Sequence, residues 1–300
     1  MPVVDLDRIS KSYSGKVAVR ELSLRIEQGT IFGLLGPNGA GKTSTIRMMV
    51  GMTLPDSGAV RLFDEPFRRD HLRRVGYLPE ERGLYKRMKV IDQLVFMGQL
   101  HGLEASAAKA RARQWCERME IAESMDKKTQ ELSKGMQQKI QFIATLLHDP
   151  ELIIMDEPSS GLDPVNVSLL EQTLLELRSK GRTILFSTHR MEQVEKLCDA
   201  ICLVDQGRAV LEGTMRAVKS RYARDRVVVE YDGDASFLTD PSITELREFP
   251  GRAEFKLRNG ADGQALLASA ARHARIFKFE MVEPSLEEIF IRTVGGRTDA

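Results

Sequence analysis

Nine residues near the start of the chain read Gly36-Pro37-Asn38-Gly39-Ala40-Gly41-Lys42-Thr43-Ser44, which fits the phosphate-binding pattern GxxxxGK[ST]. They follow a nearly uninterrupted apolar run, 31–35, which predicts a strand buried on both faces of an α/β sheet. Apolar residues at helical spacing come next. The glycines let backbone N–H groups surround phosphate oxygens, and the helix N-terminus adds positive charge. We expect these residues to bind a nucleotide, with Lys42 at its terminal phosphates and Thr43 as a magnesium ligand.

A second apolar run, 152–155, ends in two carboxylates, Asp156 and Glu157. A helical pattern separates it from a third apolar run, 183–186, which predicts a β-α-β unit and a mainly parallel core sheet. Ligands of such sheets bind at the carboxyl ends of the strands, so both carboxylates should lie beside the phosphate loop. We expect Asp156 to hold the magnesium shell and Glu157 to orient or deprotonate the attacking water.

The remaining segments predict three further parts. Residues 1–30 alternate apolar and polar positions, with Leu22, Leu24 and Ile26 on one face, which indicates antiparallel strands. Residues 88–123 have apolar positions at helical spacing and indicate a mainly helical insert. After about residue 221 the pattern is that of a small α+β domain, with strands at 226–231, 253–257 and 276–282, a helix at 264–273, and a last helix opened by Pro284 in its first turn and Ser285 as its cap.

The composition limits the classes of function. The chain has 300 residues and a formal net charge of +1, so it lacks the positive field that gathers nucleic acid. Its three cysteines show neither CxxC nor His-paired spacing, and we expect no disulfide, no zinc and a reducing cytoplasm. No apolar run approaches the roughly 18–20 residues of a membrane helix, so any membrane role requires a partner chain.

One more motif makes the prediction specific. The stretch Leu132-Ser133-Lys134-Gly135-Met136-Gln137-Gln138 resembles the signature of ATP-binding cassette (ABC) proteins, usually written LSGGQ. The resemblance implies an α/β fold of the P-loop NTPase class over residues 1–220: a mainly parallel core sheet, an antiparallel β subdomain and a helical subdomain at about 88–148. A C-terminal α+β accessory domain would occupy 225–294 and a tail 295–300. ATP and Mg²⁺ are the implied cofactors.

The same resemblance implies roles for residues scattered along the chain. In a head-to-tail homodimer, ATP on one phosphate loop would be covered by the partner's signature residues Ser133, Lys134, Gly135, Met136 and Gln137. Tyr13 resembles the aromatic that stacks on adenine, and His189 resembles the switch histidine that acts with the catalytic Glu157. Ser160, Gly161, Leu162 and Asp163 resemble the D-loop, the segment that follows the catalytic carboxylate.

Three positions depart from the family pattern. Lys134 stands where glycine is usual, and Met136 stands where many relatives have glycine or a small polar residue. Glu80 stands where most ABC ATPases have the glutamine of the Q-loop, which contacts the magnesium site and the membrane partner. A carboxylate can still bind the metal or its water, so Glu80 remains a candidate magnesium ligand.

The resemblance implies an ATPase that drives a separate membrane permease from the inner, cytoplasmic face of the cell membrane. The tail Pro284-Ser285-Leu286-Glu287-Glu288-Ile289-Phe290 is similar to an exporter-type subfamily that includes sodium-extrusion and drug-export ATPases. Two alternatives stay open at this point. A soluble ABC ATPase of DNA repair or the ribosome predicts a long coiled-coil insertion or two tandem cassettes, and a nucleotide-sensing regulator predicts ATP binding with negligible turnover.

Overall fold

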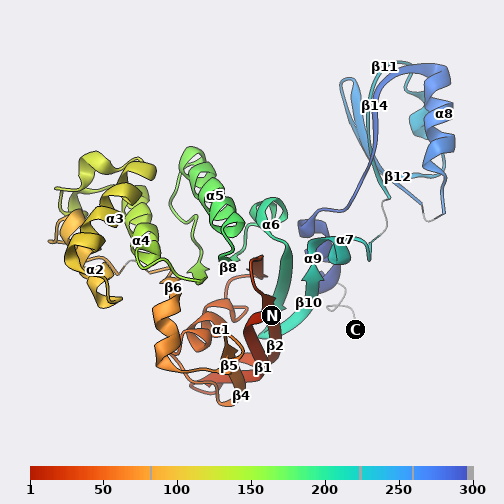
Figure 1. Ribbon diagram of the computed structural model, residues 1–300. Helices are drawn as coiled ribbons and strands as arrows, with labels where there is room; N and C mark the ends of the chain where they lie inside the picture. The colour runs from red at the N-terminus through yellow and green to blue at the C-terminus, as the bar shows by residue number, and fades with distance from the viewer. Residues whose placement is uncertain (82, 223–224, 259, 296–300) are drawn as a thin grey trace. The chain divides into compact units, whose positions relative to one another are not determined.

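The computed structural model describes residues 1–81, 83–222, 225–258 and 260–295. They form two compact units, the first comprising Met1–Met215 and the second beginning at Arg216 (Figure 1). Each unit has a hydrophobic core of its own. Of the predicted tail, 295–300, only Gly295 is described, as the last residue of a helix, and 296–300 lie outside the described residues. Within the described part of the chain, every helix is too short or too polar to cross a membrane.

The central sheet of the first unit has the strand order β10-β9-β3-β8-β7-β6. Its five parallel strands are β3 (Ile31–Leu35), β6 (Val75–Leu78), β7 (Leu152–Asp156), β8 (Thr183–Thr188) and β9 (Ala200–Asp205). β10 (Arg208–Thr214) is antiparallel to β9. Every residue of β3, β7 and β8 is buried, as expected for strands covered on both faces. The predicted parallel core sheet is confirmed.

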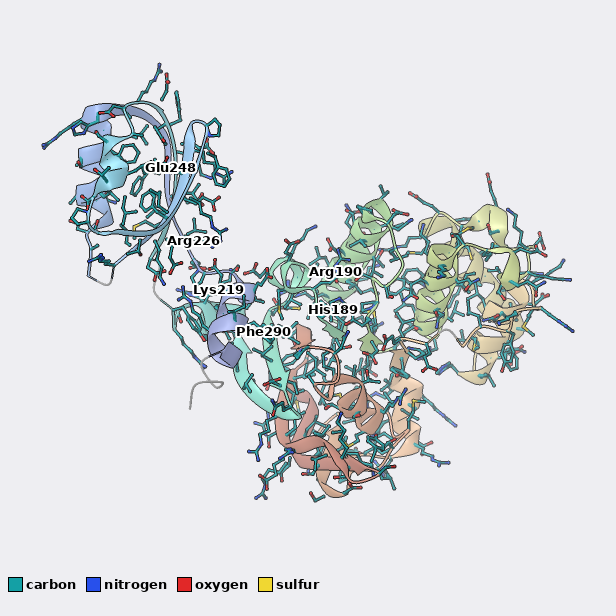
Figure 2. All side chains as sticks on the ribbon, turned by 180° about the vertical axis from the view of Figure 1, so that it is seen from behind. His189, Arg190, Lys219, Arg226, Glu248 and Phe290 are labelled. Atoms are coloured by element: carbon teal, nitrogen blue, oxygen red, sulfur yellow. The ribbon has the colours of Figure 1, made fainter. Side chains whose placement is uncertain are left out.

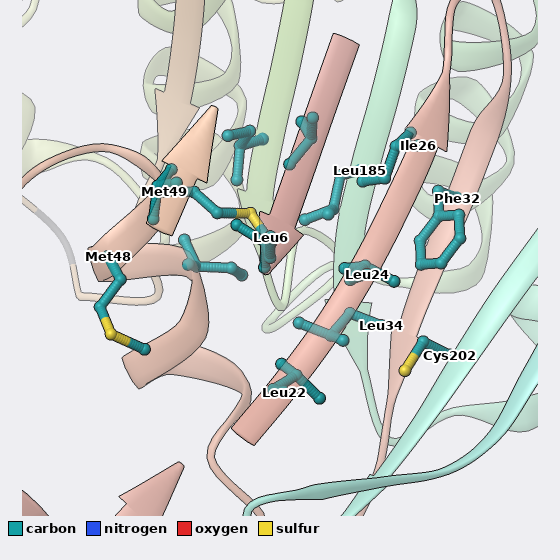
Figure 3. Packing of buried hydrophobic residues seen from close by; sticks show 14 of the residues in the cluster. Leu6, Leu22, Leu24, Ile26, Phe32, Leu34, Met48, Met49, Leu185 and Cys202 are labelled. Carbon is teal, nitrogen blue, oxygen red and sulfur yellow. The ribbon is translucent and has the colours of Figure 1, made fainter. Parts of the chain in front are cut away.

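A second, antiparallel sheet comes mostly from the first 62 residues. It consists of β1 (Pro2–Tyr13), β2 (Lys16–Glu27), β4 (Ser57–Leu62) and β5 (Glu65–Pro66), in the order β2-β1-β4-β5. Leu22, Leu24 and Ile26 alternate with exposed residues along β2, which confirms the predicted face. These side chains share one core with Phe32 and Leu34 of the central sheet (Figure 3). The core thus fixes the antiparallel sheet against β3, the strand that precedes the phosphate loop.

Helices surround the central sheet. α1 (Lys42–Met49) starts within the phosphate loop. α2 (Val90–Leu100), α3 (Ala105–Arg118) and α4 (Lys134–Leu146) contact one another as a separate helical layer, which confirms the predicted helical insert (Figure 1). α5 (Pro164–Ser179) joins β7 to β8, and α6 (Met191–Leu197) joins β8 to β9. α7 (Met215–Lys219) follows β10, and short 3₁₀ turns occupy Arg69–Arg74, Ala122–Ser124 and Thr129–Glu131.

The second unit is the α+β domain that the sequence predicts. Its antiparallel strands are β11 (Arg226–Gly233), β12 (Ile243–Phe249), β13 (Arg252–Leu257) and β14 (Ala274–Val282), in the order β12-β13-β11-β14. α8 (Gly263–His273) packs its buried Leu266 and Ala270 on one face of this sheet, and a 3₁₀ turn covers Ser236–Thr239. α9 (Leu286–Gly295) follows β14.

One local prediction in this unit needs correction. Ser285 is the cap of α9, since its Oγ accepts a hydrogen bond from the Glu288 backbone N–H at 3.2 Å. The helix begins at Leu286, so Pro284 precedes the cap and does not lie in the first turn. The physical reason is the order of the positions: the cap residue comes directly before the first helical residue. Since Ser285 is the cap, Pro284 must lie outside the helix.

Candidate active site

Two glycines of the phosphate loop, Gly36 and Gly41, have no room for a side chain. Gly36 and Gly41 have φ angles of 149° and 108°, which side chains disfavour. A Cβ atom on Gly36 would lie 2.1 Å from the carbonyl oxygen of Val204, and one on Gly41 would lie 2.4 Å from that of Ala18. The loop therefore packs directly on the backbone of β9 and β2, which fixes it at the end of β3.

Lys42 is held inside this loop. Its Nζ donates hydrogen bonds to the carbonyl oxygen of Gly36 at 2.7 Å and to that of the next residue at 3.1 Å. Burial lowers the pKa of Lys42, and the nearby carboxylates of Glu157, Asp156 and Glu80 oppose that shift. The lysine ammonium group therefore lies near three carboxyl groups at the loop.

A cavity of about 330 Å³ opens at the loop. Its walls combine the phosphate loop with the carboxylates at the carboxyl ends of β6 and β7. Its lining consists of Ala18, Asn38, Gly39, Ala40, Gly41, Lys42, Thr43, Ser44, Glu80, Asp156 and Glu157. Gly36 and Pro37 lie at the base of the loop, outside this lining. Tyr13, the last residue of β1, also lies outside it, with its ring 5.8 Å from Lys11 Nζ. The structure therefore brings together most of the predicted nucleotide-binding residues.

Asp156 has one satisfied and one unsatisfied oxygen. The side chain is 1% exposed, and its Oδ1 accepts a hydrogen bond from the Ser187 hydroxyl. Its Oδ2 is buried without a hydrogen-bond partner among the described residues. A buried carboxylate oxygen without a partner is unfavourable unless a cation or donor binds it. Because Thr43 lines the same cavity, the two side chains fit a Mg²⁺ ion, which prefers a few oxygen ligands beside phosphate.

Glu157 is held by the end of the neighbouring strand. Its backbone has a φ of 50°, in the left-handed region that non-glycine residues rarely adopt. Its Oε1 accepts a hydrogen bond from the His189 backbone N–H at 3.1 Å and lies 2.8 Å from His189 Nδ1. Its Oε2 accepts a bond from Thr188 Oγ1 at 3.2 Å. Figure 2 labels His189 and Arg190, which follow β8. These contacts fix the carboxylate at the cavity wall, where it can orient a water molecule.

A second cavity of about 310 Å³ shares Asn38, Glu80 and Glu157 with the first. The rest of its lining is Ser159, three residues of the predicted D-loop and the two residues that follow β8: Ser159, Ser160, Gly161, Leu162, His189 and Arg190. Asp163 lies outside it and caps α5, since its Oδ1 accepts the Asn166 backbone N–H at 3.0 Å. The D-loop thus lies next to Glu157 and adjoins the nucleotide cavity.

The signature residues are placed elsewhere. Ser133 is the cap of α4, and its Oγ accepts the Met136 backbone N–H at 3.2 Å, which confirms that the signature opens a helix. Lys134 is exposed, and Gln137 Nε2 donates to two backbone carbonyls of the preceding turn. Residues 133–137 line neither cavity. Within one chain, the signature residues therefore do not contact the cavity at the phosphate loop.

Three residues that line or support the nucleotide cavity were not predicted from the sequence, nor were Ser159 and Arg190 of the second cavity. Ser187 and Thr188 bind the two carboxylates, and Ala18 lines the nucleotide cavity. The polar pair directly after the apolar run 183–186 was a usable signal, because it follows a buried strand and precedes His189. Ala18 offered no signal, since its contact with the loop depends on how β2 packs.

Comparison with known proteins identifies the family of this chain. The family model described as ABC transporter matches residues 19–160, and the one described as ATP-binding protein DrrA1-3-like, C-terminal domain, matches residues 213–294. The chain is 42% identical over 295 residues to the uncharacterized ABC transporter ATP-binding protein YhaQ of Bacillus subtilis, covering 98% of this chain and 99% of that protein. It is 34% identical over 309 residues to Nod factor export ATP-binding protein I of Burkholderia lata, covering 98% of each.

A solved ATP-binding subunit of an ABC transporter superposes with a TM-score of 0.68 at 27% identity, over 73% of this chain and 92% of that one. These similarities support a transporter subunit over a soluble ABC ATPase or a regulator. They also confirm the ABC ATPase fold. The chain therefore belongs to the ABC transporter ATP-binding proteins, the ATPase subunits of such transporters.

Proposed function

We propose that this subunit hydrolyses ATP at the cavity beside Lys42 and uses the energy to drive export through a separate permease. The observation that carries the proposal is the convergence of Lys42, Asp156 and Glu157 on one cavity, with Glu157 held by His189. These are the groups that phosphoryl transfer to water requires: a phosphate cradle, a metal-binding carboxylate and a group that orients the nucleophile.

Each residue has a role that follows from its contacts. Lys42, whose Nζ lies inside the phosphate loop, would bind the terminal phosphates of ATP. Glu157 would accept the proton of the attacking water, and His189 would keep its carboxylate aimed at that water. A Mg²⁺ ion held by Thr43 and Asp156, with Glu80 as a further oxygen ligand, would supply positive charge against the phosphate oxygens.

A second copy of the chain completes the site. The N-terminus of α4, with the exposed Ser133 and Lys134, carries partial positive charge but lies outside its own nucleotide cavity. In a head-to-tail homodimer this end, with Gly135, Met136 and Gln137, would cover the γ-phosphate bound to the partner. The exposed Tyr13 would stack on adenine, and the D-loop residues Ser160–Asp163 would lie at the dimer interface.

Export is supported by the name of a relative. One protein similar to this chain over 98% of its length is named for Nod factor export. We therefore assign 1–220 to the ATPase cassette and 225–294 to an accessory domain of an exporter, located in the cytoplasm on the inner face of the membrane through its permease. The transported molecule would be selected by that permease.

The test compares two glutamates at opposite ends of β7. Glu157→Gln removes the proton acceptor, so ATP turnover should fall at least about a hundredfold while ATP binding is retained. Glu151→Gln is the matched control, because Glu151 directly precedes the same strand and binds Arg74 at the edge of the sheet opposite to the cavity. Phosphate release measures turnover, and size-exclusion chromatography in ATP and Mg²⁺ should show a dimer of Glu157→Gln. Turnover of Glu157→Gln at the wild-type rate would refute the assignment.

A further inference from the structure

The segment that begins with the proposed catalytic carboxylate, 157–161, lies between two helices of the first unit. Two backbone bonds fold it into consecutive turns: Ser160 N–H to the Glu157 carbonyl oxygen at 3.1 Å, and Leu162 N–H to the Ser159 carbonyl oxygen at 3.2 Å. Because the segment begins with Glu157, a shift of its backbone also shifts the carboxylate. What fixes this segment therefore fixes the reacting geometry.

On one side the segment is bound by α4, the helix that begins with the signature. Gln138 is 2% exposed, and its Nε2 donates a hydrogen bond to the carbonyl oxygen of Pro158 at 3.1 Å. One turn earlier, a Cβ atom on Gly135 would lie 3.3 Å from the carbonyl oxygen of Gly161, so the helix backbone approaches the segment closely there too. α4 thus contacts the segment near both of its ends.

On the other side the segment is bound by α6, the helix that begins two residues after His189. Ser159 is 3% exposed, and its Oγ donates a hydrogen bond to Gln193 Oε1 at 3.1 Å. Gln193 is 6% exposed, and its Nε2 is buried without a partner among the described residues. An unpaired buried amide donor is unfavourable for stability. An apolar side chain would fill the same space without that disadvantage, so stability alone does not explain this glutamine.

We infer that Gln138 and Gln193 are positioning residues for ATP hydrolysis, which hold the segment 157–161 so that the Glu157 carboxylate stays aimed at the attacking water. Neither side chain lines the nucleotide cavity. Both act through the backbone that carries Glu157. The inference rests on the proposed function, since it assumes that Glu157 is the proton acceptor.

Gln138 donates its hydrogen bond to the segment, whereas Gln193 accepts one from it, and this difference can be tested. Pro158 needs a donor from residue 138, and a glutamate there would place a carboxylate against a carbonyl oxygen. Ser159 needs an acceptor from residue 193, and a glutamate there would keep the bond. The same change, glutamine to glutamate, should therefore lower turnover at position 138 and preserve it at position 193. A general effect of new negative charge or of poorer packing would not separate the two positions in this way.

The experiment measures kcat and KM for ATP, the Kd of a fluorescent ATP analogue and the melting temperature on the full-length chain. Gln138→Met and Gln193→Met remove the hydrogen bonds at nearly constant volume, and each should lower kcat about tenfold or more with KM and Kd within about twofold, because a misplaced catalytic group mainly affects the transition state. Gln138→Glu should match Gln138→Met. Gln193→Glu should stay within about twofold of the wild-type kcat.

Gln93→Met is the matched control, because Gln93 is a fully buried glutamine of α2 whose Nε2 also lacks a partner among the described residues. It should keep the wild-type kcat. Wild-type kcat in both Met variants, or a loss in Gln193→Glu equal to that in Gln193→Met, would overturn the inference. These outcomes can be told apart from a failure of the proposed function, which would show as a wild-type rate of Glu157→Gln itself.

Discussion

Replacing His148 by glutamine should remove a pH-sensitive part of the stability of the first unit. His148 follows α4, and its ring stacks on that of His101 at the end of α2, with centroids 3.8 Å apart and an interplanar angle of 7°. Its Nε2 lies 3.1 Å from the carbonyl oxygen of Val75, so the neutral ring donates there. Its Nδ1 is buried without a partner among the described residues. A second proton would enter a buried position that offers no acceptor.

The magnitude follows from the shifted pKa. Burial, and next the neighbouring His101, lower the pKa of His148 from 6.5 to about 4. A group whose pKa is lowered in the folded state stays neutral there but takes up a proton on unfolding, so its contribution is complete above pH 6.5 and is lost as the pH falls toward 4. Between pH 7.5 and 5 this loss amounts to about 2 kcal/mol. For a unit of this size the melting temperature should fall by about 4 to 8 °C.

The assay is thermal unfolding of the wild type and His148→Gln from pH 7.5 to 5, without nucleotide. Carboxylates titrate in both proteins and cancel in the difference, so the gap between the two melting temperatures should narrow or reverse on acidification. His273→Gln, at the exposed end of α8, should keep the wild-type pH dependence because it leaves the stacked pair intact. A constant difference between wild type and His148→Gln across this range would refute the reasoning.

Two further substitutions test the phosphate loop and the C-terminal unit. Lys42→Ala should weaken ATP binding about tenfold or more, because it removes a charged hydrogen-bond donor worth about 1.5–3 kcal/mol; titration calorimetry checks this, and an unchanged Kd would contradict it. Ser285→Ala should destabilise the second unit by about 1 kcal/mol, since the Glu288 N–H loses its cap. Urea unfolding, monitored by the hydrogen exchange of backbone amides within α9, measures that loss. Unchanged exchange would show that the cap does not contribute.

The fold was most predictable where burial was complete. β3, β7 and β8 are apolar along their whole length because both faces are covered, and such a run is visible in the sequence alone. β12 was missed for the opposite reason. It lies at the edge of its sheet and five of its seven side chains are exposed, so its apolar residues do not mark a face. Edge strands are specified by their neighbour's hydrogen bonds more than by their own pattern.

The site was predictable as far as its motifs are continuous in sequence. The phosphate loop and the pair Asp156 and Glu157 follow apolar strands, and the parallel sheet brings them to one cavity. The residues that hold those carboxylates were not predictable in the same way. Ser187 was marked only by its position after the apolar run 183–186, which does not say that it binds Asp156. Gln193 supports the segment after Glu157 through a single hydrogen bond with Ser159, 34 residues away, which leaves no periodic trace in a sequence. Only the packed structure pairs them with their partners.

The contacts of α4 connect the two proposed halves of the reaction. Its N-terminus, at Ser133, lies outside the chain's own nucleotide cavity and would contact a phosphate bound to the partner. Its second turn holds Pro158, the residue directly after Glu157 of the same chain. A rigid helix moves as one body, so docking of its N-terminus on the partner's ATP would also move or steady the backbone at Pro158. ATP bound to one copy would therefore position the Glu157 that acts on the ATP of the other, and loss of the Gln138 hydrogen bond should uncouple the two sites while leaving each able to bind nucleotide.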